Sequence, residues 1–207
     1  SWAPLGDPHA TAIGEGGAHI GEGWITQEIA HGGVYSWRAQ VDPSTPQPES
    51  HWPAGKSSLE RWRITHGERD FTVSAWYYFP TDYPSDVWSL LMQIKEAQNP
   101  RNPPAVIAIN RDRELLLYNG LTNSNVKVSS TVVPVGRWVQ IKTRFVINHN
   151  NGRVTTWLDG QLVFDVSGIN TLGHSTTRDV YFGVGNYLSG NIVRSHVYID
   201  DIWVTRK

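Results

Sequence analysis

The sequence predicts an all-β protein, a β-jelly-roll sandwich of two antiparallel sheets with little helix. Two observations favour this fold: many short segments are rich in β-branched and aromatic residues, and Gly, Pro, Asn or Asp clusters separate them. A third is that no long segment has a clean helical period. Because 207 residues is an ordinary length for one undivided sandwich, we expect a single domain over residues 1–207.

The expected strands follow one another at short intervals through most of the chain. Residues 1–33 are rich in Gly, Ala and His, and we expect them to be irregular. The polar segment 46–58 is expected to be a loop. Residues 87–98 have some helical character, but the NPRNPP stretch and the neighbouring residue types favour a strand. The expected strands are 34–41, 59–65, 71–79, 88–95, 105–110, 114–119, 137–147, 153–160, 161–166, 179–187 and 196–205.

One pair of strands has a turn that can be predicted closely. WLDGQLV places Asp159 and Gly160 between two alternating segments. An Asp-Gly pair in this position is typical of a tight hairpin turn whose two central residues both have positive φ. We therefore expect a hairpin here.

The stretch YFGVGNYLSG carries the most unusual face of any expected strand. Side chains alternate across a strand, so Tyr181, Gly183, Gly185 and Tyr187 share one face. Glycine within a strand often marks the close approach of a ligand or of another backbone. The alternative explanations are a β-bulge or the crossing of two sheets.

Several other strands place cationic and amide side chains on the face that does not point to the core. The simplest interpretation is an ordinary solvated sheet face. If these faces instead line the concave side of one curved sheet, they form a groove suited to a negatively charged, hydroxylated polymer such as a polyuronic acid. Arg binds a carboxylate with two hydrogen bonds, and Trp stacks on a sugar ring. The candidate binding residues are Arg38, Arg61, Lys95, Trp138, Lys142, Arg144 and Asn186.

Composition excludes several classes of protein. The net charge of -1 argues against a nucleic-acid-binding protein of the basic kind. No apolar run has the length of a membrane span, so we expect no membrane partner. The chain has no Cys, which excludes disulfides and a Cys nucleophile. We expect a processed, secreted monomer, extracellular or periplasmic, of bacterial or fungal origin.

Two motifs resemble a known group of enzymes. YFGVGNY resembles the C-terminal signature of jelly-roll alginate lyases, and QIK lies where those enzymes have a Gln-Ile strand. The run from Ser57 to Glu96 is similar to glucuronan lyase and heparin lyase I, in the same concanavalin-like superfamily. The resemblance covers most of the chain from about Arg38 onward. It implies a polysaccharide lyase that acts on a uronic-acid-containing polymer by β-elimination.

The resemblance also implies roles for three residues. Tyr187 matches the tyrosine that acts on the leaving-group oxygen, Gln93 the amide that holds the uronate carboxylate, and His51 the loop histidine that serves as base. Gly183 stands where alginate lyases have a signature lysine, and Lys95 where they have a histidine. These departures leave a non-catalytic carbohydrate-binding module as the alternative, with Trp76, Tyr78, Trp138 and Tyr187 as stacking platforms.

β-Elimination sets clear demands on the site. The substrate carboxylate must be neutralised, for which Gln93, Asn186, Arg38 or Arg61 are the candidates. A histidine is a competent base at neutral pH and a neutral tyrosine a natural acid. Without His51, Tyr187 would need cations such as Lys95 or Lys142 to lower its pKa for both proton transfers.

The sequence requires no metal and disfavours glycoside hydrolysis as a second enzyme class. No metal is required for β-elimination; a structural calcium site is possible, to which at most one of Asp200 and Asp201 would contribute, because they alternate in the strand. Glycoside hydrolysis needs two carboxylates on one face of the groove. Glu60, Glu96 and Glu114 lie at strand margins or on uncertain faces, which disfavours that class.

Overall fold

The computed structural model describes residues 21–42, 54–64, 69–96, 102–173, 180–189 and 193–207, with only the backbone described for 54–64. These residues form thirteen strands and no helix, so none of them forms a helix that could cross a membrane. The strands are β1 (Gly21–Thr26), β2 (Ser36–Val41), β3 (Ala54–Ile64), β4 (Asp70–Tyr78), β5 (Trp88–Glu96), β6 (Ala105–Ile109), β7 (Glu114–Asn119), β8 (Ser124–Val132), β9 (Trp138–Val146), β10 (Gly152–Leu158), β11 (Gln161–Ile169), β12 (Val180–Ser189) and β13 (Ser195–Arg206).

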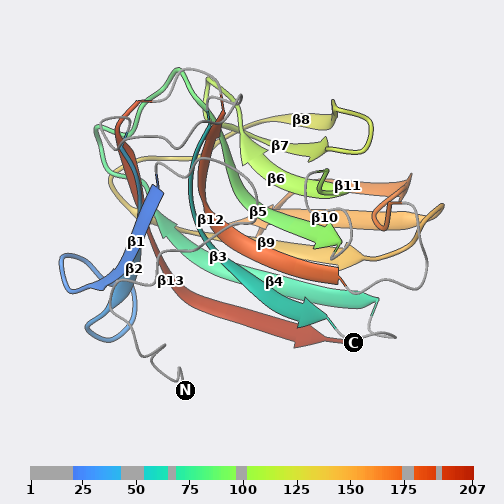
Figure 1. Cartoon of the computed structure of the whole chain (residues 1–207), viewed down its shortest axis with the longest axis horizontal. Helices are drawn as coiled ribbons and strands as arrows, with labels where there is room; N and C mark the ends of the chain where they lie inside the picture. Colours follow the sequence, from blue (N-terminus) through green and yellow to red (C-terminus); the bar gives the residue numbers. More distant parts are fainter. Residues whose placement is uncertain (1–20, 43–53, 65–68, 97–101, 174–179, 190–192) are drawn as a thin grey trace.

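The strands form two antiparallel sheets, as predicted (Figure 1). The seven-stranded sheet has the order β1-β2-β13-β4-β9-β10-β11, and the six-stranded sheet the order β3-β12-β5-β6-β7-β8. Neighbours such as β12 and β3, or β13 and β2, are far apart in the sequence, so the pairing is largely non-local. This is a jelly-roll sandwich, and the fold predicted from the sequence is confirmed.

The main core lies between the two sheets. In β4 the side chains of Phe71, Val73, Ala75 and Tyr77 are buried in strict alternation with half-exposed residues. The Tyr77 hydroxyl donates a 2.7 Å hydrogen bond to the carbonyl oxygen of Leu91 in the facing sheet. Burial raises the pKa of that phenol well above its ordinary value, so the bond is made by the neutral form.

The hairpin prediction is confirmed in its geometry. Asp159 and Gly160 join β10 to β11 with φ angles of 50° and 80°, so both central turn residues have positive φ. Asp159 Oδ1 also accepts a 2.8 Å hydrogen bond from the backbone NH of Gln140 in β9. This hydrogen bond therefore ties the turn to β9, the strand that pairs with β10 on its other side.

Three local expectations were wrong. Residues 21–26 form β1, inside the segment expected to be irregular, and 54–58 form the start of β3, inside the expected loop. β8 was not expected at all: Ser124–Val132 is a mostly exposed edge strand in which Val126 is only partly buried against the core and Val128 and Val132 are exposed. Pairing with β2, β12 and β7, rather than local residue preference, determines these three segments.

Candidate active site

Tyr187, Gln93 and Lys95 lie on one face of the six-stranded sheet, as predicted. Gln93 lies opposite Gly183 of β12, and Lys95 opposite Tyr181. Directly opposed residues of an antiparallel pair share a face, and Tyr187 follows Gly183 on that face of β12. This is the face turned away from the core, because Phe182 and Val184 point inward.

The site has an apolar floor of its own. A second buried cluster, separate from the main core, consists of Leu90, Val106, Ala108 and Leu116. The side chains of Trp88, Tyr118 and Tyr187 pack against it. Gln93 is directly opposite Val106, so its amide borders the same cluster and is only 3% exposed. The face therefore carries a desolvated amide next to aromatic rings.

Trp88 holds the aromatic part of the site together. Its ring meets the Tyr187 ring edge to face, with centroids 6.5 Å apart, and meets the Tyr118 ring in the same way at 5.7 Å. The Tyr118 hydroxyl donates a 2.5 Å hydrogen bond to Asn123 Oδ1. Neither Trp88 nor Tyr118 was singled out from the sequence. Alternation on β7 separates Tyr118 from the core residues Leu115 and Leu117. On β5, however, strict alternation would place Trp88 with Met92 in the core, and only the register shift between Leu90 and Met92 puts Trp88 on the outer face.

The protonation state of Tyr187 follows from this packing. Burial against the floor raises its pKa above the ordinary value of 10.0, and the nearby Tyr118 raises it further. The pKa of Tyr118 is also raised by burial. Both phenols are therefore neutral near pH 7, and Tyr187 can donate a proton there but not accept one.

Asn186 does not lie on the face of Tyr187, where the prediction of a substrate-binding residue would place it. Its side chain is fully buried between the sheets. Its Oδ1 accepts hydrogen bonds from the hydroxyls of Tyr83 (3.0 Å) and Ser89 (2.9 Å), and its Nδ2 donates to Ser195 Oγ at 3.2 Å. The amide is thus a structural anchor on the inner side of β12, directly behind Tyr187.

The glycines of β12 have two explanations, and both apply. Neither Gly183 nor Gly185 has a positive φ, so backbone conformation does not require glycine at these positions. The strand is, however, irregular there, with register shifts between Phe182 and Gly183 against β3 and between Val184 and Tyr187 against β5. The bulges bend the strand, and Gly183 and Gly185 place no side chain between Gln93 and Tyr187 on this face, although both glycines are buried.

Comparison with known proteins decides the family. A profile described as "Polysaccharide lyase" matches residues 24–203, nearly the whole chain. The chain belongs to this polysaccharide lyase family. No curated protein sequence matches it significantly.

Solved structures of similar fold include several lyases. An endo-β-1,4-glucuronan lyase from the fungus Trichoderma reesei has a TM-score of 0.69 and 16% identity, over 90% of this chain and 87% of that one. The alginate lyase vAL-1 from Chlorella virus has a TM-score of 0.63 and 10% identity, over 88% and 89%. A variant of the alginate lyase A1-II′ has a TM-score of 0.62 and 15% identity, over 83% and 80%. At these identities the likeness shows the shared fold.

Four predicted binding residues lie in the other sheet from Tyr187, on the opposite side of the sandwich from the candidate site. Arg38 is in β2, and Trp138, Lys142 and Arg144 are in β9, all in the seven-stranded sheet. Alternation correctly placed them away from the core, but the outer faces of two stacked sheets point in opposite directions. The single groove that was to combine them with Tyr187 is therefore not formed.

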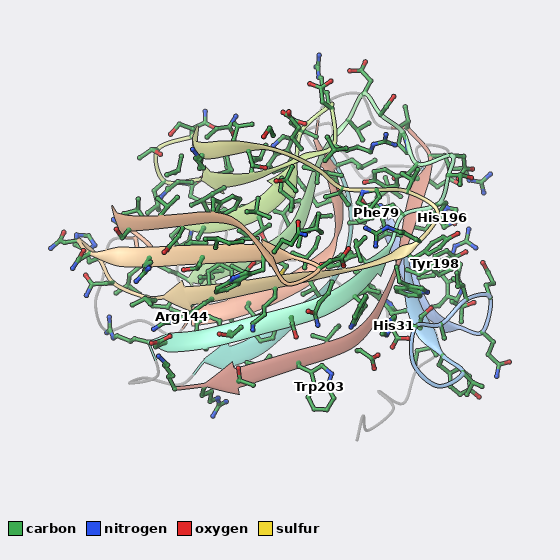
Figure 2. The ribbon with its side chains drawn as sticks, turned by 180° about the vertical axis from the view of Figure 1, so that it is seen from behind. His31, Phe79, Arg144, His196, Tyr198 and Trp203 are labelled. Atoms are coloured by element: carbon green, nitrogen blue, oxygen red, sulfur yellow. The ribbon has the colours of Figure 1, made fainter. Side chains whose placement is uncertain are left out.

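Two of these cations, Arg38 and Arg144, form hydrogen bonds within the seven-stranded sheet and its loops. Arg38 donates to Glu28 Oε2 at 2.6 Å and to Gln40 Oε1 at 2.9 Å. Arg144 forms a two-bond ion pair with Asp70, with distances of 2.8 and 2.6 Å. These contacts lie on the outer face of the seven-stranded sheet. Arg144 is labelled in Figure 2, which shows the molecule from the side opposite to that of Figure 1.

Two predicted residues fall outside what the structure describes. His51, the expected base, lies in the undescribed segment 43–53, and the side chain of Arg61 is not among those described. The backbone of β3 pairs with β12 on the side opposite β5, with Lys56 opposite Tyr187. The chain that leads out of the 43–53 segment therefore passes directly beside Tyr187.

The two consecutive acidic residues of β13 act together, contrary to the expected alternation. Asp201 has a φ of 44°, and the register against β4 shifts between Asp200 and Trp203. Asp200 Oδ2 accepts from the backbone NH groups of His31 (2.8 Å) and Gly32 (3.1 Å), while Asp201 Oδ2 is 2.8 Å from His31 Nδ1. Both carboxylates bind the β1–β2 loop. Within the described residues, no group of three or more acidic or His side chains is arranged for a metal ion.

Proposed function

We propose that this chain cleaves a uronic-acid-containing polysaccharide by β-elimination on the outer face of the six-stranded sheet. Membership of the polysaccharide lyase family supports the reaction class. The observation that carries the site is the pairing of Gly183, which has no side chain, with Gln93, which puts a buried amide on the face that holds Tyr187. Similar folds include a glucuronan lyase and alginate lyases, and we extend their acidic type of substrate to this chain.

The reaction requires two proton transfers. A base removes the proton from the carbon next to the uronate carboxylate, and the electron pair left behind forms a carbon–carbon double bond. The glycosidic oxygen leaves from the adjacent carbon with its bonding electrons and takes up a proton from an acid. The products are a shortened chain and a new non-reducing end that carries an unsaturated uronate.

Tyr187 is the acid in this scheme. Its raised pKa keeps the phenol protonated through the neutral range, as a donor to the leaving oxygen requires. Trp88 and the second cluster pack against the ring and partly bury it. The same surroundings disfavour a tyrosinate, so a separate base is needed, and we propose His51 for that role.

Gln93 holds the carboxylate of the sugar whose proton is removed. An amide NH donates to a carboxylate, and the bond strengthens as negative charge develops during proton removal. Gln93 and Leu90 are three residues apart, so Gln93 lies about 10 Å along the sheet from the position opposite Tyr187, at ~3.3 Å per residue. That distance is within the combined reach of the two side chains and one sugar ring. Lys95, further along the same face, would contact a neighbouring uronate.

A non-catalytic binding module on the same fold is the second candidate. The specific observation in its favour is that Gly183 and Lys95 stand where the alginate lyases it resembles have a lysine and a histidine. This alternative also predicts binding of an acidic polymer, but no bond cleavage. We further propose that the protein acts outside the cell, because its polymeric substrate is too large to be taken up whole.

The test is a lyase assay with purified protein. The unsaturated uronate absorbs in the ultraviolet, so incubation with glucuronan, alginate and a neutral glucan distinguishes the candidates. We expect a steady rise in absorbance with at least one polyuronate and none with the neutral glucan. Retardation of the protein in a gel containing polyuronate, without any rise in absorbance, would favour the binding module.

A further inference from the structure

A row of five cross-strand partners crosses the outer face of the seven-stranded sheet, on the opposite side of the molecule from Tyr187. Each member lies directly opposite the next one, over β13, β4, β9, β10 and β11. Because directly opposed residues point to the same side, their side chains form one line. The row is Trp203, Ser74, Lys142, Trp157 and Leu162.

The two ends of the row are unusually exposed for apolar side chains. Trp203 is 66% exposed and Leu162 is 60% exposed. Figure 2 shows the Trp203 ring standing away from the ribbon of β13. Trp203 and Trp157 are separated by three inter-strand steps, about 14 Å at ~4.8 Å each. An extended oligosaccharide of a few sugars would span both rings.

Lys142 supplies an unneutralised charge between the two tryptophans. Its Nζ lies 5.3 Å from the centroid of the Trp157 ring. In the part of the chain that the structure describes, no carboxylate forms an ion pair with Lys142. The neighbouring cations differ: Arg144 is paired with Asp70, and Arg153 with Asp165. A ligand of complementary charge at this position is an anion flanked by flat rings.

A second aromatic row lies beside it. Trp24, Arg38, Tyr198, Tyr78 and Trp138 are also consecutive cross-strand partners, and Glu28 of the β1–β2 loop bonds to Arg38 and Tyr198 in that row. His31 of the same loop meets the Trp138 ring edge to face, with centroids 5.7 Å apart, and stacks on the ring of Trp76 in β4, with centroids 3.8 Å apart and planes at 15°. The protein thus fills one tryptophan platform with its own flat ring and leaves the Trp203–Trp157 row open among the described residues.

We propose that the row Trp203–Ser74–Lys142–Trp157 is a second binding surface for the acidic polysaccharide, separate from the cleavage site. The tryptophans stack on sugar rings, Lys142 binds a uronate carboxylate between them, and the Ser74 hydroxyl contacts the sugar hydroxyls. The choice of an acidic polymer rests on the proposed function. A surface of this kind raises the effective concentration of a long chain at the cleavage face without taking part in the chemistry.

The test compares binding with cleavage in the full chain. The double variant Trp157→Ala, Trp203→Ala and the single variant Lys142→Gln are measured by affinity electrophoresis in gels containing alginate, glucuronan or a neutral glucan. Because the double variant loses stacking, the polysaccharide in the gel should bind it about tenfold more weakly than wild type, which corresponds to ~1.4 kcal/mol. The Lys142→Gln variant should be retained less than wild type in the polyuronate gels and to the same extent as wild type in the neutral glucan gel. The control is Tyr35→Ala, an equally exposed aromatic outside the row (54% exposed).

The cleavage readout separates this inference from the proposed function. kcat/KM of the double variant for a short uronate oligosaccharide should equal that of wild type, while KM for the long polymer rises. Unchanged retention of the folded double variant and of Lys142→Gln would overturn the second surface, whether or not the protein is a lyase. Wild type that binds without cleaving would refute the proposed function and leave this test intact. If Trp203→Ala instead converts a dimer to a monomer in sedimentation and leaves retention unchanged, the row is a contact between copies and the inference is wrong.

Discussion

Asn186 and Tyr187 are consecutive in β12 and point to opposite sides of the six-stranded sheet. Asn186 is fully buried on the inner side, where it bonds to Tyr83, Ser89 and Ser195. Tyr187 packs against the second cluster on the outer side. The buried amide therefore fixes the backbone that carries the proposed acid, at the bulge where β12 changes register against β5.

Replacing Asn186 should affect stability and activity together. Asn186→Ala leaves the buried hydroxyls of Tyr83 and Ser89 without their acceptor, which costs about 1–3 kcal/mol per unsatisfied group. We expect a lower midpoint in urea unfolding and, in the folded fraction, a lower kcat with little change in KM. Ser195→Ala removes only the 3.2 Å bond and is the milder control. Wild-type kcat in a destabilised Asn186→Ala would show that the anchor does not position Tyr187.

Gln93 should matter mainly for the chemical step. Gln93→Leu keeps the size of the side chain but removes the amide that neutralises the carboxylate as charge develops. Loss of one such donor typically lowers kcat by about 10²–10³-fold. The matched control is Gln140→Leu, on the outer face of the other sheet, for which we expect no change in cleavage of a short oligosaccharide. Equal rates for the two variants would remove Gln93 from the mechanism.

The raised pKa of Tyr187 predicts a particular alkaline behaviour. The folded state favours the neutral phenol, so its contribution to stability is fully present below the unfolded pKa, near 10. That contribution is lost as the pH rises through the higher folded pKa. The tyrosinate absorbance of wild type minus that of Tyr187→Phe should therefore show one ionisation above pH 10. An ionisation well below 10 would mean a tyrosine poised as a base.

The Asp165–Arg153 pair predicts the acid side of the stability profile. The Arg153 hydrogen bond lowers the pKa of Asp165 to about 2. A lowered folded pKa gives stability that is present above the unfolded pKa, near 4, and lost as the pH falls to about 2. The difference in unfolding free energy between wild type and Asp165→Asn should shrink over that range. A difference for Asp165→Asn that stays constant over that range would contradict the assignment.

Sequence patterns predicted the layers and strand faces well. In β9, alternation correctly placed Val139, Ile141 and Phe145 in the core and Lys142 outside. The same alternation cannot say which sheet a strand joins, because strand order depends on long-range pairing. Arg38 and Arg144 were therefore assigned to the wrong outer face.

The bulge in β5 is the other feature that the sequence did not reveal. Leu91 and Met92 both enter the core because β5 shifts register against β6 between Leu90 and Met92. Strict alternation had placed Leu91 with Gln93. The glycines at 183 and 185 did indicate that β12 is irregular, and the strand of Gln93 was correctly expected beside it.

The most direct test of the account is the rate of β-elimination by Tyr187→Phe. This change removes the phenolic proton and almost none of the ring that packs beside Trp88. The account predicts a fall in kcat on the best polyuronate of about 10²–10⁴-fold, the usual contribution of a positioned acid, with retention in a polyuronate gel unchanged. Elimination by folded Tyr187→Phe at the wild-type rate would contradict it.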